Sequence, residues 1–254
     1  MKTEAKVLIA EDNVMNQMLI KHLLRSRGYK FDLVPNGAEA VEALKRQSYD
    51  LILMDIQMPE MDGYSATEQI RQALRSSVPI IAMTAHAMSG NKEKCIKAGM
   101  NDFITKPLDA DALFDMMQRH LKQDLSGGSH VQKTVDGING DTVIDLCIVE
   151  KYSHGNADFK NEIIKEFVTI VPGNISSLEN AISEGNYKQI GRIAHDMKTT
   201  VHVMGLTTLI GDLLIQIENF AKSNAGLALI LNIFSDIKQV CLRAVREANR
   251  LVVA

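Results

Sequence analysis

Residues 51–63 read LILMDIQMPEMDG, and this stretch decides the fold of the first half of the chain. The apolar run 51–54 is typical of a short buried strand, and Pro59 and Gly63 mark the loop that follows it. Asp55 therefore lies at the carboxyl end of a predicted strand, the edge where open α/β sheets bind ligands. Asp also opens many turns, so this stretch alone leaves a purely structural role open.

Short apolar runs alternate with helical patterns through the first half of the chain. The runs cover residues 7–10, 31–34, 51–54, 78–83 and 103–104, and a helical pattern follows each of them, as far as about residue 122. Strands that alternate with helices predict a parallel sheet with right-handed crossovers and helices on both faces. We therefore expect an α/β fold, doubly wound, with five parallel strands.

Polar residues follow the apolar runs, at the points where the strands are expected to end. They are Glu11, Asp12, Asp55, Thr84 and Lys106. Three carboxylates that converge on one edge of a sheet repel each other and need a cation, and oxygen ligands alone suit Mg²⁺. A carboxylate nucleophile, a metal, a hydroxyl and an ammonium are together the groups that phosphoryl transfer requires.

The first half resembles the response-regulator receiver family over about residues 5–122. The resemblance is carried by the pair Glu11-Asp12, by Asp55 within MDIQMPEMDG, by Thr84 within MTA and by FITKP at 103–107. It implies a flavodoxin-like fold in which Asp55 accepts a phosphoryl group from a histidine kinase.

The resemblance also implies roles for the other site residues. The metal ligands would be Asp12, Asp55 and the main-chain carbonyl of Gln57, with Glu11 acting through water. Thr84 and Lys106 would contact the phosphoryl oxygens. The Lys106-Pro107 peptide would be cis, an isomer that proline permits at a small energetic cost.

Composition limits the other possibilities. The chain has 254 residues, 46% of them hydrophobic, which suits two globular domains. The net charge of -3 and the scattered basic residues disfavour binding to nucleic acid or anionic lipid. Cys95, Cys147 and Cys241 are widely spaced without a metal-ligand pattern, so we expect reduced thiols in the cytoplasm. No apolar run is long enough to span a membrane.

A polar stretch, QDLSGGSH at 123–130, separates the two halves. We predict a receiver domain at 1–124, a flexible linker at 125–138 and a helical domain at 139–254. Helices are predicted at about 142–152, 156–184, 187–204, 206–222 and 226–250, because apolar residues recur there every three or four positions. Such helices are expected to fold as an all-α, antiparallel four-helix bundle.

The helix at 187–204 carries His195 and Lys198. His195 lies far around the helix from the apolar stripe formed by Ile190, Ala194, Met197 and Val201, so we expect it to face solvent. An exposed histidine on a helix is usually an ordinary surface residue, and that interpretation stands for this helix taken alone.

The second half resembles the histidine-phosphotransfer (HPt) family over about residues 136–250. The stretch AHDMKTTVHVMG at 194–205 has the family's histidine, a lysine three positions later and a glycine ten positions later. The resemblance implies that His195 is phosphorylated and that Lys198 stabilises the phosphoryl group. Imidazole suits this role because much of it is neutral and nucleophilic near pH 7. Thr199 departs from the glycine usual in the family, which puts partner geometry in question.

The leading hypothesis is a two-component phosphorelay protein in which Asp55 and His195 both exchange phosphoryl groups. The order of the two domains resembles the C-terminal part of a bacterial hybrid sensor kinase, and the expected partners are a histidine kinase and receiver or phosphotransfer domains. No nucleotide-binding loop is visible, so we expect no ATP-dependent kinase activity from this chain. Two alternatives stay open: an interaction module in which His195 is never phosphorylated, and a DNA-binding transcriptional regulator.

Overall fold

The computed structural model describes residues 5–84, 89–121 and 143–253. The described residues form two compact units, the first within residues 1–133 and the second within residues 134–254. The linker predicted at 125–138 lies outside the described residues.

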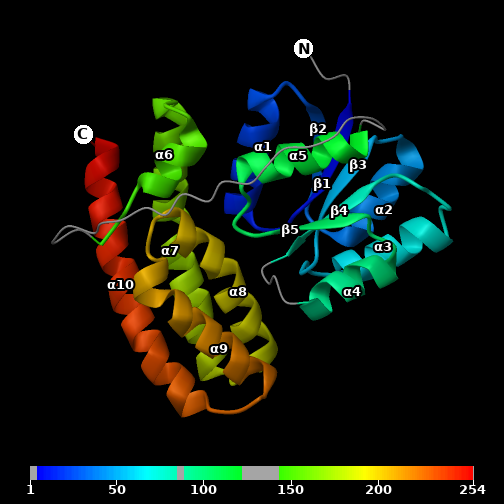
Figure 1. The fold of residues 1–254 in the computed structure, drawn as a ribbon. Coiled ribbons are helices and arrows are strands. Elements are labelled where there is room, and N and C mark those ends of the chain that lie inside the picture. The colour runs from blue at the N-terminus through cyan, green and yellow to red at the C-terminus, as the bar shows by residue number, and fades with distance from the viewer. Residues whose placement is uncertain (1–4, 85–88, 122–142, 254) are drawn as a thin grey trace. The chain divides into compact units, whose positions relative to one another are not determined.

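The first unit alternates five strands with five helices (Figure 1). The strands are β1 (Lys6–Ala10), β2 (Lys30–Val34), β3 (Leu51–Asp55), β4 (Ile80–Thr84) and β5 (Asp102–Thr105). The helices are α1 (Val14–Ser26), α2 (Gly37–Arg46), α3 (Gly63–Gln72), α4 (Ser89–Ala98) and α5 (Ala110–Leu121). All strand pairs are parallel and the order is β2-β1-β3-β4-β5, which confirms the predicted flavodoxin-like sheet.

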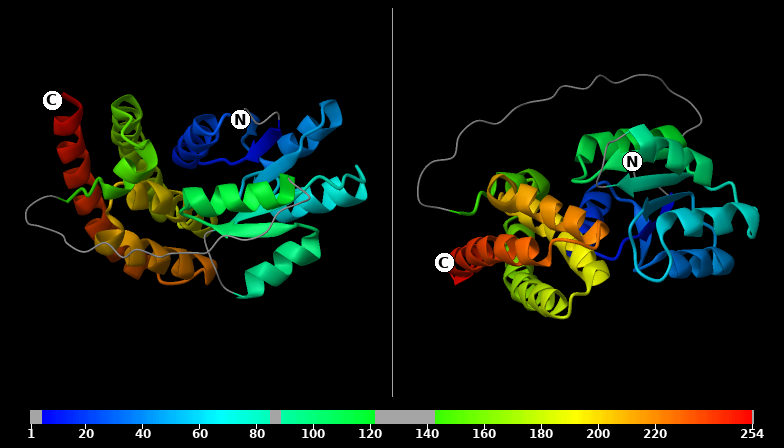
Figure 2. Two further views of the ribbon diagram at one scale, coloured as in Figure 1. Left: turned by 45° about the horizontal axis from the view of Figure 1, so that its top comes forward. Right: turned by 90° about the horizontal axis from the view of Figure 1, so that it is seen from below.

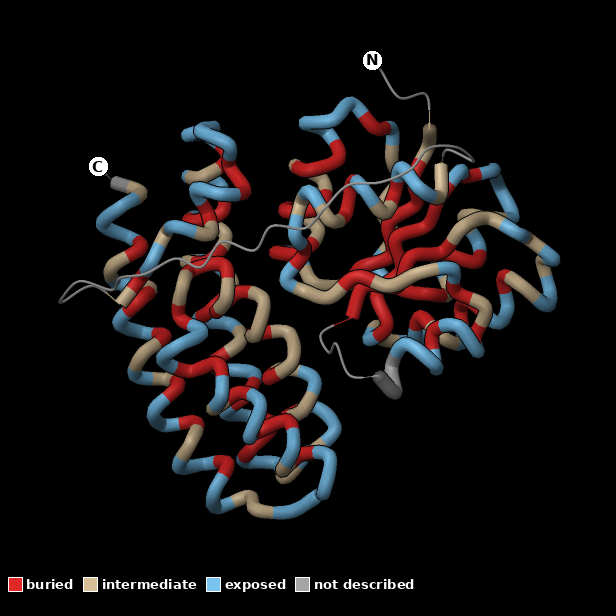
Figure 3. Tube along the Cα trace, viewed as in Figure 1, coloured by how far each residue is buried: buried red, intermediate tan, exposed pale blue. Residues whose placement is uncertain are grey.

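Helices cover both faces of this sheet, with α1 and α5 on one side and α2, α3 and α4 on the other (Figure 1). The central strands are buried along their whole length, which Figure 3 shows as continuous red tubes. Apolar side chains of β3 and β4, such as Ile52, Met54 and Ala82, pack against Ala66 and Ile70 of α3. Because both faces are covered, the central strands β3 and β4 are apolar up to their last residue instead of alternating.

The second unit is helical in the part that is described. Its elements are α6 (Cys147–Ser153), α7 (Ala157–Ser183), α8 (Tyr187–Val203), the π-helical turn η1 (Thr207–Gly211), α9 (Asp212–Lys222) and α10 (Leu227–Val253). Contacts run from α7 to α8, from α8 to α9, from α9 to α10 and from α10 back to α7. Figure 2 shows these helices from two further directions. Their buried core includes Phe167, Ile190, Met197, Ile217 and Ile237.

Two predicted helix bounds in this unit were wrong for physical reasons. The helix predicted at 142–152 begins only at Cys147. Before it, the Val143 N–H donates to Glu247 Oε2 at 2.9 Å and the Asp145 N–H donates to the Met204 carbonyl at 3.1 Å, so this segment is bound to distant parts of the unit. The helix predicted at 206–222 starts with a π-helical turn at Thr207–Gly211 before α9 begins. Sequence periodicity does not distinguish these hydrogen-bond patterns.

No helix within the described ranges is long and apolar enough to cross a membrane. Cys95, Cys147 and Cys241 are all free thiols.

Candidate functional site

The carboxyl edge of the sheet gathers an acidic cluster. Glu11 and Asp12 follow β1 and Asp55 ends β3, and ligand oxygens of these three residues lie within 4.8 Å of one another. Glu11 is fully buried and Asp55 is 4% exposed. The predicted convergence of the three carboxylates is therefore present in the fold.

Lys106 joins this cluster from the end of β5. Its Nζ lies 2.5 Å from Asp55 Oδ2 and 2.7 Å from Glu11 Oε2. The Lys106 main-chain N–H donates to the Thr84 carbonyl at 2.7 Å, so the last residue of β4 lies directly beside the lysine. The Lys106-Pro107 peptide is cis, as predicted.

The loop after β3 is shaped by a glycine. Gly63 N–H donates to the Ile56 carbonyl at 3.0 Å, and a Cβ at this position would lie 2.2 Å from the Asp55 carbonyl oxygen. Only glycine permits the loop to close so tightly behind Asp55. Within the loop, Gln57 N–H donates to Asp55 Oδ1 at 3.3 Å, which holds the second carboxylate oxygen.

Burial and neighbouring charges shift the pKa values of Glu11 and Lys106 in this cluster. Burial and the neighbouring Asp55 charge raise the pKa of Glu11 to about 8, although Lys106 and Asn16 act in the opposite direction. Burial opposes the charged form of Lys106, but the two carboxylates outweigh it and raise its pKa. Three carboxylates and one ammonium leave two negative charges when all are ionised, which one divalent cation balances.

The donor set fits a hard cation. All the candidate ligand atoms of Glu11, Asp12 and Asp55 are oxygens, the type that Mg²⁺ prefers. Glu11 Oε2 is fully buried, and although it forms an ion pair with Lys106, no hydrogen bond within the described residues is made to it. A buried carboxylate that shares a cluster with two other acids is suited to a cation.

The second unit holds a separate cluster of charged residues. His195 and Lys198 lie on α8, and Glu218 comes from the neighbouring α9. His195 Nδ1 lies 2.9 Å from Glu218 Oε1, and Lys198 Nζ lies 2.8 Å from the same oxygen. Burial raises the pKa of Glu218, but hydrogen bonds from His195 and Lys198 outweigh this effect and bring the pKa to about 2. Glu218 is therefore a buried carboxylate with two partners.

His195 is less exposed to solvent than predicted. Its side chain is only 15% exposed, because α9 packs across that side of α8. Gly191, one turn before His195, permits this approach: a Cβ there would lie 3.2 Å from the Ala221 Cβ. Thr199, where the resemblance led us to expect glycine, is partly exposed on α8.

Glu218 is the site residue that the sequence interpretation missed. A signal was present, because Glu218 lies on the buried stripe of α9 with Leu214, Ile217 and Ala221. A carboxylate at such a position is nearly always paired.

Gly205 has a packing role. It has a φ of +72°, and a Cβ would lie 2.6 Å from the Asp145 carbonyl oxygen. The glycine ten positions after His195 thus accommodates the segment before α6 in this structure.

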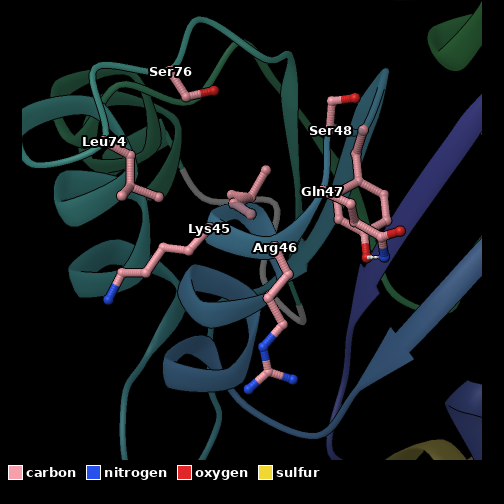
Figure 4. Close-up of a pocket in the computed structure, with 8 residues that line it drawn as sticks. Lys45, Arg46, Gln47, Ser48, Leu74 and Ser76 are labelled. Carbon is pink, nitrogen blue, oxygen red and sulfur yellow. Dashed lines mark hydrogen bonds between the residues drawn. The ribbon is translucent and has the colours of Figure 1, made fainter.

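A shallow pocket of about 330 Å³ lies on the first unit, away from the acidic cluster (Figure 4). Its lining comes from the end of α2, the loop between α2 and β3 and the segment before β4, and includes Lys45, Arg46, Tyr49 and Ser76. It lies at the amino ends of the strands, opposite the edge that carries Asp55.

Comparison with known proteins identifies the first unit. Residues 7–118 match the sequence family described as the response regulator receiver domain. This segment is a receiver domain. It is a receiver domain of a two-component phosphorelay system and is homologous to the receiver regions of hybrid histidine kinases.

Two curated relatives illustrate this homology. Hybrid signal transduction histidine kinase B of Dictyostelium discoideum is 45% identical over 129 residues, which cover 46% of this chain and 7% of that protein. The signal transduction histidine-protein kinase BarA of Escherichia coli is 32% identical over 199 residues, which cover 77% of this chain and 22% of that protein. The chain thus spans less than a quarter of the length of these relatives.

Among solved structures, the receiver domain of a sensor histidine kinase from Pseudomonas aeruginosa is 46% identical, with a TM-score of 0.44. The match covers 47% of this chain and 98% of that one. That receiver has a magnesium ion coordinated in its active site cleft.

Proposed function

We propose that the chain is a phosphorelay intermediate with two phosphorylation sites, Asp55 in the receiver domain and His195 in the helical unit. The observation that carries this proposal is the Asp55 site, where a nearly buried carboxylate has an ammonium at 2.5 Å and two further carboxylates beside it. The incoming phosphoryl group would come from a phosphohistidine, with cleavage of its N–P bond and formation of an O–P bond on Asp55.

Each residue around Asp55 has a distinct task in this proposal. Lys106 neutralises Asp55 before transfer and a phosphoryl oxygen afterwards. The Thr84 hydroxyl donates to a second phosphoryl oxygen. Asp12, Asp55 and the Gln57 carbonyl would hold Mg²⁺, with Glu11 acting through water, and the ion would supply positive charge where the phosphoryl group is transferred.

At the second site, the ring of His195 is oriented by Glu218. A carboxylate only accepts hydrogen bonds, so Nδ1 of His195 carries the proton and donates to Glu218 Oε1 across 2.9 Å. The lone pair then lies on Nε2, which becomes the nucleophile. Positive charge that develops on the imidazole during attack is balanced by Glu218. Lys198, whose Nζ lies 2.8 Å from the same Glu218 oxygen, would contact the phosphoryl group.

We propose that residues 1–124 form the receiver domain, 125–138 a linker and 139–254 an HPt domain in which α7, α8, α9 and α10 make a four-helix bundle. The cyclic order of contacts among these four helices supports this. The alignment with BarA also supports it, because its 199 residues exceed the first unit and so include part of the second. The partners would be a histidine kinase and separate receiver or phosphotransfer domains.

Two variants of the full chain test both sites. The His195→Gln chain, treated with phosphoramidate and Mg²⁺, should acquire a base-labile acyl phosphate, and Asp55→Asn or EDTA should abolish this label. The labelled His195→Gln chain is then mixed with the unlabelled Asp55→Asn chain, and His195 of the latter should acquire an acid-labile, base-stable label. A panel of other phosphorylated receivers serves as alternative donors in the same assay.

Absence of an acyl phosphate on Asp55 would reject the receiver part of the proposal. Labelling by ATP without a second protein would contradict the absence of a kinase site. One observation favours the alternative of an interaction module: the His195 side chain is only 15% exposed, and its Nδ1 lies 2.9 Å from Glu218 Oε1. A chain that accepts label on Asp55 but never on His195, from any donor of the panel, would establish that alternative.

A further inference from the structure

The two oxygens of the Glu11 carboxylate have different environments. Oε1 accepts two hydrogen bonds, from the Asn13 main-chain N–H at 3.1 Å and from Asn16 Nδ2 at 3.0 Å. Oε2 makes neither of these contacts and lies 2.7 Å from Lys106 Nζ, which is also 2.5 Å from Asp55 Oδ2. One oxygen is thus held by the start of α1, and the other lies beside the ammonium that contacts Asp55.

Asn16 is itself held in place. It is 7% exposed, and its main-chain N–H donates to the side chain of Asn13, which caps α1, at 3.1 Å. A buried amide whose backbone is fixed by a helix cap has little freedom to turn its Nδ2 away. Its hydrogen bond to a carboxylate in this buried setting is of the charge-assisted kind.

We propose that Asn16 is a positioning residue for the cation site, acting through Glu11. By holding Oε1, the Asn16 amide fixes the rotation of the carboxylate so that Oε2 faces Asp12, Asp55 and the bound cation. This inference rests on the proposed function, because it requires that the acidic cluster binds Mg²⁺. Partners that orient the groups around a metal typically change its affinity roughly 10- to 100-fold when removed.

Gln17, the next residue, provides a matched control. Its Nε2 donates to the main-chain carbonyl of Glu11 at 2.7 Å, so it contacts the same residue without touching the carboxylate. If Asn16 only filled a buried polar position, loss of either amide would have a similar effect. If Asn16 orients the carboxylate, only its loss weakens the cation site.

The experiment measures Mg²⁺ affinity of the full chain by isothermal titration calorimetry, with circular dichroism to verify folding. Asn16→Leu, of similar size but without a donor, should bind Mg²⁺ roughly 10-fold or more weakly. Gln17→Leu should stay within about twofold of the unmodified chain. Glu11→Ala should also weaken binding, and adding Asn16→Leu to it should have little further effect, because the group through which Asn16 acts is gone.

Unchanged Mg²⁺ affinity in Asn16→Leu, or an equal loss in Gln17→Leu, would overturn the positioning role while leaving the metal site intact. A loss that persists undiminished in the Glu11→Ala background would overturn it as well. Absence of Mg²⁺ binding by the unmodified chain would reject the metal part of the proposed function, and the positioning role with it.

Discussion

Glu218 Oε1 on α9 lies 2.9 Å from His195 Nδ1 on α8, although the two residues are 23 positions apart in the chain. The same oxygen lies 2.8 Å from Lys198 Nζ. One buried carboxylate thus contacts both of the residues that the HPt resemblance singles out.

The first prediction concerns phosphoryl acceptance by His195. Glu218→Gln should slow it roughly 10- to 100-fold, because a hydrogen bond to a charged partner contributes about 1.5–3 kcal/mol. The measurement is the initial rate of label transfer from a phosphorylated receiver to chains that also carry Asp55→Asn. Glu179→Gln is the control, since the ion pair of Glu179 with Lys238 is largely exposed on α7 and α10, and its rate should not change. Equal rates for the two variants would contradict the role of Glu218.

The second prediction is a pH dependence of stability. The pKa of Glu218 is lowered from 4.5 to about 2 in the folded chain, so its ion pairs stabilise the second unit fully above about pH 4.5 and are lost as the pH falls toward 2. The expected contribution is on the order of 3 kcal/mol. Urea unfolding of the unmodified chain and of Glu218→Gln should differ most near neutral pH and converge in acid. A constant difference across this range would rule out the linkage.

The third prediction couples Mg²⁺ to pH through Glu11. Its pKa is raised from 4.5 to about 8 in the folded chain, so without a cation the stability of the receiver domain falls as the pH rises across this window. Mg²⁺ requires the deprotonated carboxylate, so its thermal stabilisation of the chain should be larger at about pH 8.5 than at about pH 6. Differential scanning calorimetry measures the rise in melting temperature that Mg²⁺ causes at each pH. Glu11→Gln should remove most of this pH dependence, and an unchanged dependence in that variant would assign it to another group.

The fourth prediction compares two glycines of the helical unit. Gly205→Ala should destabilise it by more than about 2 kcal/mol, since the residue has a left-handed φ and its new Cβ would meet the Asp145 backbone. Gly173→Ala lies within α7 with open space around it and should stabilise the unit by about 0.5–1 kcal/mol. Urea unfolding followed by circular dichroism distinguishes the two. If Gly205→Ala stabilised the unit as much as Gly173→Ala does, Asp145 would not pack on Gly205 in solution.

Much of the receiver domain was predictable from the sequence. β3 and β4 are short apolar runs that end in a polar residue, so Asp55 and Thr84 could be assigned to strand ends before their surroundings were known. Parallel strands then bring these ends to one edge. In the helical unit, the breaks at Gly185 and Gly205 follow from their left-handed conformations, which the helix ends require.

The sequence by itself therefore determined the doubly wound sheet, the order of the helices and the clustering of acids around Asp55, because these depend on local periodicity and on the geometry of parallel strands. The tertiary structure alone decided the pairing of His195 with Glu218, the covering of His195 by α9 and the orientation of Glu11 by Asn16. These depend on burial and on the approach of separate elements, such as the close contact at Gly191 and Ala221. No pattern within one helix encodes how near its neighbour comes.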